Sequence, residues 1–256
     1  MGAELNAPEN RLLYLYGITE SPPQDFPELI GVDLHTKVVP LQCDEVVCWV
    51  SRVSADAFGE NLARNMENLE WLAEAGVAHQ RVIAAIAQES EILPARFGTV
   101  FRTEASLRKH VRGRARELKR DFERVKDAEE WGVKVFALEP AVRLPEVRSG
   151  RDYLKAKAAL LPKRRPRSDT SNQIAEFEQA LRRVSAETAA IGIVSGGQRG
   201  LTFQTSLLVK RANRKKFESV LKRFSDSWAA ARRIECTGPW PPYSFVSREH
   251  EGARSK

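Results

Sequence analysis

The chain has 256 residues, a net charge of +7 and 42% hydrophobic residues, enough apolar side chains for one large or two small folded domains. Its longest apolar runs, such as Val46 to Val50, are far shorter than the roughly 18 residues of a membrane-spanning helix, so we expect no membrane partner. The polar and acidic start, Met1 to Asn10, does not have the apolar core of a signal peptide and favours a cytoplasmic protein.

The first half begins with strands. Residues 11–18, 37–41 and 45–53 are rich in Val, Leu and Tyr, and the turn residues 42–44 predict that the last two strands form a hairpin. A helix capped by Ser54 or Asp56 is expected to follow, because apolar residues recur there at spacings of three and four. Its inward positions would be Phe58, Leu62, Met66, Leu69 and Leu72.

Gly76 is expected to break or kink this helix before it resumes over residues 77–88. Residues 91–101 then read as an extended segment at a sheet edge, because Pro94 cannot donate to a ladder. Thr103 is a suitable N-cap for a basic helix that continues to about Lys126.

The second half repeats this outline. The alternating segment 131–138 predicts a strand, and helices are expected over residues 152–161 and 168–190, separated by a charged loop at 162–167. The longer helix would bury Ile174, Phe177, Leu181, Val184 and Thr188. Further strands are predicted at 191–194, 201–210 and 233–236, and a helix before the last strand would bury Phe217, Val220, Leu221, Phe224 and Trp228.

Together these elements predict an α+β fold made of two ferredoxin-like domains with the βαββαβ plan. We expect an N-terminal domain with a trailing helix at 1–128 and a C-terminal domain at 129–237. A C-terminal extension, here called the strap, would comprise residues 238–256.

The strap begins with the proline-rich sequence GPWPPYSFV. Its three prolines fix the backbone in extended geometry, so the strap should present Trp240, Tyr243 and Phe245 as stiff apolar anchors. An interdomain clamp within the chain is the favoured interpretation. The alternative is a ligand for another protein, because Pro239 and Pro242 form a PxxP pair.

Arg96 and Phe97 are further candidate binding residues, within the sequence LPARFGTVF. A guanidinium among apolar neighbours is rarely unpaired, so we expect a carboxylate or several carbonyls to hold Arg96. Contact with a ligand is the alternative.

The sequence offers little for catalysis. His35, His79, His110 and His250 are scattered without metal-binding spacing, and Cys43, Cys48 and Cys236 form no CxxC pair and read as buried thiols. The glycine-rich segment 195–200 has no P-loop lysine and reads as a hairpin turn. We therefore expect no enzymatic activity, no catalytic residue, no metal and no cofactor.

An RNA-binding protein is the main alternative, because the predicted plan is shared with RNA-recognition motifs. The sequence Leu13-Tyr14-Leu15-Tyr16-Gly17-Ile18 resembles the first short motif of that fold, but the nearest match to the second motif, at 96–101, falls one element too late. Residues 1–101 also carry 6 Lys and Arg against 15 Asp and Glu, a net charge of −9, which repels phosphate. The remaining residues carry 35 against 19, or +16, so the second half could bind RNA nonspecifically, but nucleic acid is an unlikely partner of the chain.

Four stretches resemble the gas vesicle GvpL/GvpF family. They are LYLYGI at 13–18, ILPARFGTVF at 92–101, GRDYLK at 150–155 and TGPWPPYSFV at 237–246, in the order of the family and over nearly the whole chain. Ala95 departs from the larger residue expected there. The resemblance implies a two-domain α+β protein of the cytoplasm and the gas vesicle, a minor component or assembly factor. It also implies partners, namely the hydrophobic shell protein GvpA and other gas vesicle proteins.

Overall fold

The computed structural model describes residues 10–22, 28–138, 167–190 and 198–247. Contacts between residues divide the chain into two units: unit 1 consists of Met1–Glu130 and Pro239–Lys256, and unit 2 of Trp131–Gly238. The chain therefore leaves unit 1, forms unit 2 and returns to unit 1. None of the helices in the described ranges is both long and apolar enough to cross a membrane. Both units combine helices with a sheet in a mixed α+β fold with antiparallel pairing.

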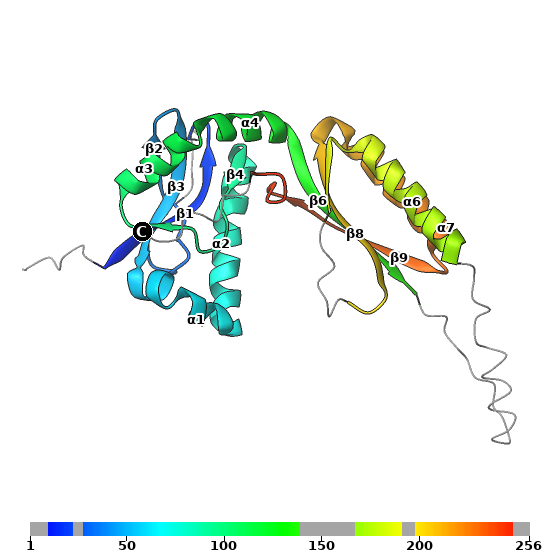
Figure 1. Cartoon of the computed structure of the whole chain (residues 1–256), viewed down its shortest axis with the longest axis horizontal. Helices are drawn as coiled ribbons and strands as arrows, with labels where there is room; N and C mark the ends of the chain where they lie inside the picture. The colour runs from blue at the N-terminus through cyan, green and yellow to red at the C-terminus, as the bar shows by residue number, and fades with distance from the viewer. Residues whose placement is uncertain (1–9, 23–27, 139–166, 191–197, 248–256) are drawn as a thin grey trace, which may run out of the picture. The chain divides into compact units, whose positions relative to one another are not determined.

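Unit 1 contains a five-stranded sheet (Figure 1). Its strands are β1 (Arg11–Thr19), β2 (Val39–Cys43), β3 (Val46–Ser54), β4 (Ile92–Pro94) and β5 (Val100–Phe101). The strand order is β2-β3-β1-β4, β5 pairs with β1, and all these pairs are antiparallel. The predicted hairpin is confirmed, with Asp44 at φ 54° in the turn between β2 and β3.

A bulge in β1 requires a glycine. Leu15 pairs with Val50 and Gly17 pairs with Trp49, so one residue of β1 has no counterpart on β3. A Cβ atom on Gly17 would lie 2.6 Å from Cδ1 of Ile92 and 2.8 Å from the carbonyl oxygen of Leu93. Glycine therefore allows β4 to approach β1 closely at this point.

The predicted break at Gly76 is wrong. The π-helix η1 (Asp56–Glu60) is followed by α1 (Leu62–Glu67) and by α2 (Leu69–Glu89), which passes through Gly76 without interruption. The break lies at Asn68, whose extended backbone ends α1. Its side-chain oxygen accepts from the amides of Glu70 (3.0 Å) and Trp71 (3.2 Å), an N-cap that starts α2.

The basic helix predicted after Thr103 is observed as two helices, α3 (Glu104–Gly113) and α4 (Ala115–Val125). The predicted cap at Thr103 is confirmed: its hydroxyl accepts from the amide of Ser106 at 3.1 Å, and the Ser106 hydroxyl receives the amide of Thr103 at 3.2 Å. Arg114 separates the two helices.

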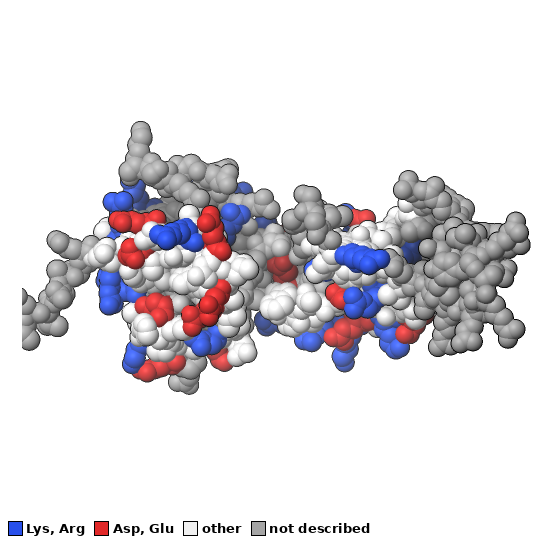
Figure 2. All heavy atoms as spheres, turned by 90° about the horizontal axis from the view of Figure 1, so that it is seen from below, with Lys and Arg blue, Asp and Glu red and all other residues white. Residues whose placement is uncertain are grey.

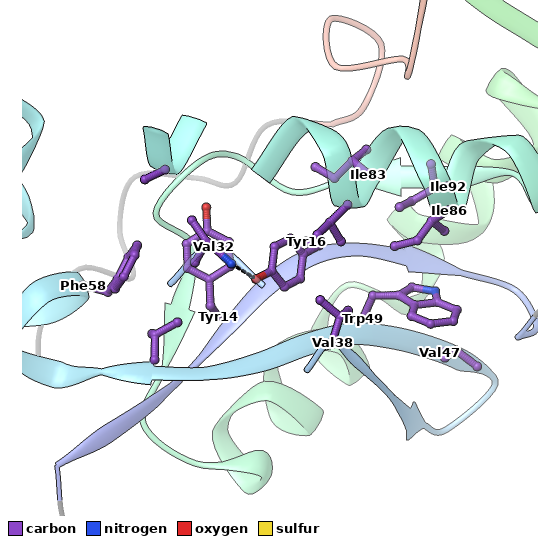
Figure 3. Packing of buried hydrophobic residues seen from close by; sticks show 13 residues of the cluster. Tyr14, Tyr16, Val32, Val38, Val47, Trp49, Phe58, Ile83, Ile86 and Ile92 are labelled. Carbon is purple, nitrogen blue, oxygen red and sulfur yellow. Dashed lines mark hydrogen bonds between the residues drawn. The ribbon is translucent and has the colours of Figure 1, made fainter. Parts of the chain in front are cut away.

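The core of unit 1 lies between α2 and the sheet. Figure 3 shows Tyr14 and Tyr16 of β1 and Trp49 of β3 facing Ile83 and Ile86 of α2. These five side chains are fully buried. Three of them are large aromatic rings, so they contribute much of the apolar area that stabilises the unit.

Unit 2 has a four-stranded sheet and two described α-helices. The elements are β6 (Ala128–Ala137), α6 (Arg167–Val184), β7 (Glu187–Ala190), β8 (Leu201–Lys210), the 3₁₀-helix η2 (Arg211–Asn213), α7 (Arg214–Trp228) and β9 (Arg232–Trp240). The strand order is β7-β8-β6-β9. In the core, Phe177 of α6 packs against Phe224 and Trp228 of α7, at ring centroid distances of 4.9 and 5.1 Å.

The helix predicted to end at residue 190 ends at Val184, and Thr188 belongs to β7. β-branched Thr188 pairs with Leu207 of β8, so sheet pairing overrides a helical spacing that continues past the end of α6. The predicted helix 152–161, the strand 191–194 and most of the charged loop 162–167 lie outside the described residues.

Candidate functional site

The strap does not stay extended as predicted. Residues Thr237 to Trp240 continue strand β9, and the chain then turns: the amide of Tyr243 donates to the carbonyl of Pro241 (2.8 Å) and the amide of Phe245 to that of Pro242 (3.1 Å). Proline has no backbone N–H, so the prolines of this turn contribute only carbonyl acceptors. The segment after Trp240 is thus a compact turn within unit 1.

Two buried carboxylates of unit 1 hold this turn. Glu130 accepts the amide (2.8 Å) and the hydroxyl (2.6 Å) of Ser244. Asp121 accepts the amide and the hydroxyl of Ser247, each at 2.8 Å. Both carboxylates are almost completely buried, so the two serines satisfy acceptors that would otherwise be desolvated without donors.

Two arginines of α4 and its N-terminus bind the backbone of the same turn. Arg124 donates to the carbonyl of Phe245 (2.9 Å), and Arg114 donates to the carbonyl of Ser247 (3.0 Å) and to Glu117 (2.7 Å). These are charge-assisted bonds, which are stronger than neutral ones. The aromatic residues of the strap stand out in its sequence, whereas these polar anchors lie far away along the chain and carry no local signal.

The three aromatic residues of the strap differ in exposure. Phe245 is 4% exposed, whereas Trp240 is 49% exposed, so of these two residues only Phe245 is buried. Tyr243 is half-buried and packs at the edge of the unit 1 core. Burial raises the pKa of its hydroxyl far above the ordinary value, and the nearby side chain of Gln80 opposes this shift. The main apolar anchor of the strap is therefore Phe245.

Phe97 lies in a cluster of rings around His79. Its ring centroid is 5.6 Å from that of His79, 6.1 Å from Trp71 and 6.3 Å from Tyr14. His79 is 2% exposed, and its Nδ1 lies 2.9 Å from the hydroxyl of Tyr14. Burial lowers the pKa of His79 to about 4, so the imidazole is neutral at pH 7. His79 therefore has a packing role in the core of unit 1.

A pocket, here called the strap pocket, lies beside the strap within unit 1. Its apolar wall is formed by β1, β4, α4 and the strap, through Leu15, Ile18, Leu93, Leu118 and Val246. The remaining lining includes Tyr243, His110 and two guanidinium groups, those of Arg96 and Arg114, and no carboxylate. The pocket is thus apolar with a positive edge.

The prediction that Arg96 is paired is wrong. Arg96 is exposed, and within the described residues no carboxylate or carbonyl accepts a hydrogen bond from its guanidinium. Its own carbonyl accepts from the amide (3.2 Å) and the hydroxyl (2.8 Å) of Thr99, in the turn between β4 and β5. With this turn the side chain of Arg96 is exposed although its neighbours in the sequence are apolar, so water can solvate its charge.

A second surface of unit 1 exposes large apolar side chains. Leu69 is 79% exposed, Val77 69% and Met66 44%, and Ala73, midway between Leu69 and Val77, is exposed too. On α2, residues 69, 73 and 77 follow a spacing of four and so share one side of the helix. We call Met66, Leu69, Ala73 and Val77 the apolar face.

The prediction that Met66 and Leu69 lie in the core is wrong, because both side chains are exposed. The buried residues of α2 are Ala75, Ala78, His79, Val82, Ile83 and Ile86. Figure 2, drawn from the side on which α1 lies in Figure 1, shows uncharged areas among acidic and basic side chains on unit 1. An exposed cluster of this kind is typical of an interaction site.

The RNA-binding alternative has no support. The aromatic residues that could stack on bases, Tyr14, Tyr16 and Trp49, are all fully buried under α2. In the described part of the chain, no three His, Cys, Asp or Glu side chains come together as metal ligands would. Cys43 and Cys48 are buried as expected, whereas Cys236 is exposed, contrary to the expectation.

Comparisons with known proteins agree with the resemblance seen in the sequence. The family model described as "Gas vesicle synthesis protein GvpL/GvpF" matches residues 12–247. Gas vesicle protein L of Streptomyces sp. (strain CB03234) is 31% identical over 261 residues, which cover 94% of this chain and 95% of that protein.

Two solved structures have a similar fold. The crystal structure of GvpF from Anabaena sp. PCC7120 aligns with a TM-score of 0.70 at 18% identity and covers 96% of this chain and 100% of that one. GvpF from Microcystis aeruginosa aligns with a TM-score of 0.66 at 17% identity, covering 93% and 99%.

Proposed function

The chain belongs to the gas vesicle GvpL/GvpF family, and from this premise we propose that it is a non-enzymatic assembly protein that binds the hydrophobic shell protein GvpA. In this proposal it acts at the gas vesicle, where it limits the aggregation of GvpA while the shell nucleates. Other gas vesicle proteins are further partners.

The observation that carries this proposal is the apolar face. Leu69 and Val77 expose most of their side chains to water on a helix whose opposite side is well packed. Covering an exposed side chain of this size contributes about 1.5 to 3 kcal/mol when it becomes fully buried. A hydrophobic shell subunit outside its assembly presents the matching surface, so contact between the two removes apolar area from water on both.

The proposal can be tested by measuring the binding of GvpA to purified variants of the full chain. The double variant Leu69→Gln/Val77→Gln should bind GvpA at least tenfold more weakly, because it replaces the two most exposed apolar side chains. Val39→Gln is a matched control, since Val39 is also an exposed apolar residue of unit 1, 49% exposed on β2. Equal binding by all three proteins would contradict the role of the apolar face.

RNA binding gives a different result in the same experiment. A pull-down from nuclease-treated lysate should still recover GvpA, and raising salt should slow association more than it weakens the final complex. An RNA-binding protein would lose affinity steeply and log-linearly with salt. Cells without the gene should make GvpA but few or no vesicles.

We further propose that both units are variants of the βαββαβ plan, with domains at 1–128 and 129–237 and the strap at 238–256. Unit 2 supports this with the order β6, α6, β7, β8, α7 and β9. In unit 1 the described residues between β1 and β2 contain no helix, and Ile30 forms a bridge with Lys37 instead. Limited proteolysis at both proposed boundaries should release residues 129–237, and the strap should remain bound to residues 1–128 through the hydrogen bonds between Ser247 and Asp121.

A further inference from the structure

We infer that the strap pocket binds a carboxylate flanked by an apolar side chain in a segment of GvpA, an inference that rests on the proposed function. Arg96 would bind the carboxylate, and the apolar wall would receive the neighbouring side chain. The pocket is separate from the apolar face: none of its lining residues belongs to α1 or α2.

The two guanidinium groups of the strap pocket differ in their hydrogen bonds, and this difference supports the inference. Arg114 is committed to the fold, because it donates to Glu117 and to the carbonyl of Ser247 in the strap. Among the described residues, none accepts a hydrogen bond from the guanidinium of Arg96, although Arg96 lines the same pocket. A guanidinium is suited to a carboxylate because it can donate two parallel hydrogen bonds to it.

The residues that line the strap pocket determine which charge and which polarity a ligand must have. The lining contains no carboxylate, and of its two guanidinium groups Arg114 is paired with Glu117, so the charge of Arg96 favours an anion. Leu15, Leu93, Leu118 and Val246 surround the charged edge, and a fully hydrated phosphate would gain nothing from them. A peptide segment with an acidic residue beside an apolar one satisfies both parts of the pocket.

The strap makes this pocket a composite site. Val246, Tyr243 and Ser247 line one side, and the carboxylates Asp121 and Glu130 hold the strap in place through Ser247 and Ser244. Both carboxylates are buried, and neither of them lines the pocket.

The experiment uses overlapping synthetic peptides of GvpA and the full-length chain. Each acidic peptide has a twin in which Asp or Glu is replaced by Asn or Gln. At least one acidic peptide should bind the wild-type chain about tenfold more tightly than its twin. With Arg96→Ala the two peptides should bind equally, because the cycle isolates the pair formed by Arg96 and the carboxylate. Arg96→Lys should restore only part of the difference, and Arg64→Ala, on α1, serves as a control that should behave as wild type.

The outcomes distinguish this inference from the proposed function. If the wild-type chain binds GvpA through the apolar face but no twin pair depends on Arg96, the pocket assignment is wrong and the proposed function stands. If GvpA itself does not bind the wild-type chain, the proposed function fails and the inference fails with it.

Discussion

Ser247 donates its amide and its hydroxyl to the carboxylate of Asp121, each across 2.8 Å, and Asp121 is fully buried. Arg124 adds an ion pair to Asp121 at 3.4 Å. A residue of α4 and a residue more than a hundred positions later are thus joined in a dry environment, where a carboxylate without donors would be strongly unfavourable.

We predict that Asp121→Asn lowers the free energy of unfolding by about 1 to 3 kcal/mol, because an amide cannot accept the same set of donors and adds one of its own. Urea unfolding followed by circular dichroism measures this. Asp226→Asn is the control: Asp226 pairs with Lys222 at an exposed site, and its loss should change stability by less than about 0.5 kcal/mol. Equal effects of the two substitutions would contradict the importance of the buried anchor.

Removing the rings of the strap should have unequal effects. Phe245→Ala should destabilise the chain by about 3 to 5 kcal/mol, since it removes a buried ring, whereas Trp240→Ala should cost less than about 1 kcal/mol. Thermal unfolding of both variants at one protein concentration gives the comparison. A larger loss for Trp240→Ala would show that Trp240 is covered in solution.

The buried imidazole of His79 should make stability depend on pH. Its pKa is lowered from 6.5 to about 4 in the folded state, so the unfolded chain binds a proton at pH values where the folded chain does not. The contribution of the neutral His79 imidazole to the free energy of unfolding is fully present above pH 6.5, and it falls by roughly 3 kcal/mol as the pH decreases to about 4.

Denaturation midpoints at several pH values should show this fall in the wild-type chain, and His79→Phe should reduce it. His35→Gln should keep the wild-type dependence, because His35 is exposed. The imidazole can also be titrated by NMR, and an ordinary pKa for His79 would refute the explanation.

Two glycines should respond oppositely to alanine. Gly76→Ala should stabilise the chain by about 0.5 to 1 kcal/mol, because Gly76 lies inside α2 and a Cβ there meets no atom within 4 Å. Gly17→Ala should destabilise by about 1 to 3 kcal/mol, because its Cβ would collide with Ile92 and the backbone of Leu93. Chemical denaturation of the two variants tests both signs.

Local patterns predicted most strands and helices of the fold. The hairpin of β2 and β3 and the cap at Thr103 follow from alternation and capping chemistry, which act over a few residues. Met66 and Leu69 of the apolar face were predicted to lie in the core, because a spacing of three and four identifies a stripe but not what covers it. Two stripes compete along α2, and only packing against the sheet shows that Val82 and Ile86 face inward while Leu69 and Val77 do not.

The candidate site was predicted less well than the fold. Proline and aromatic content identified the strap and Phe245, but its anchoring depends on Glu130 and Asp121, which lie 114 and 126 positions before their serine partners. No local pattern connects such distant residues. For Arg96, its apolar neighbours suggested a hydrogen-bonded partner, and the turn between β4 and β5 instead leaves the side chain exposed to water.

The return of the chain to unit 1 also affects the order of folding during translation. Unit 2 separates Glu130 from Pro239 in the sequence, so the ribosome must synthesise all of Trp131–Gly238 before the partners of Asp121 and Glu130 emerge. At a synthesis rate of about 5 to 20 residues per second, at least several seconds pass before Ser244 and Ser247 can bind the two carboxylates. Until then the strap is absent from the strap pocket beside α4, and the nascent protein exposes apolar side chains that a chaperone could bind.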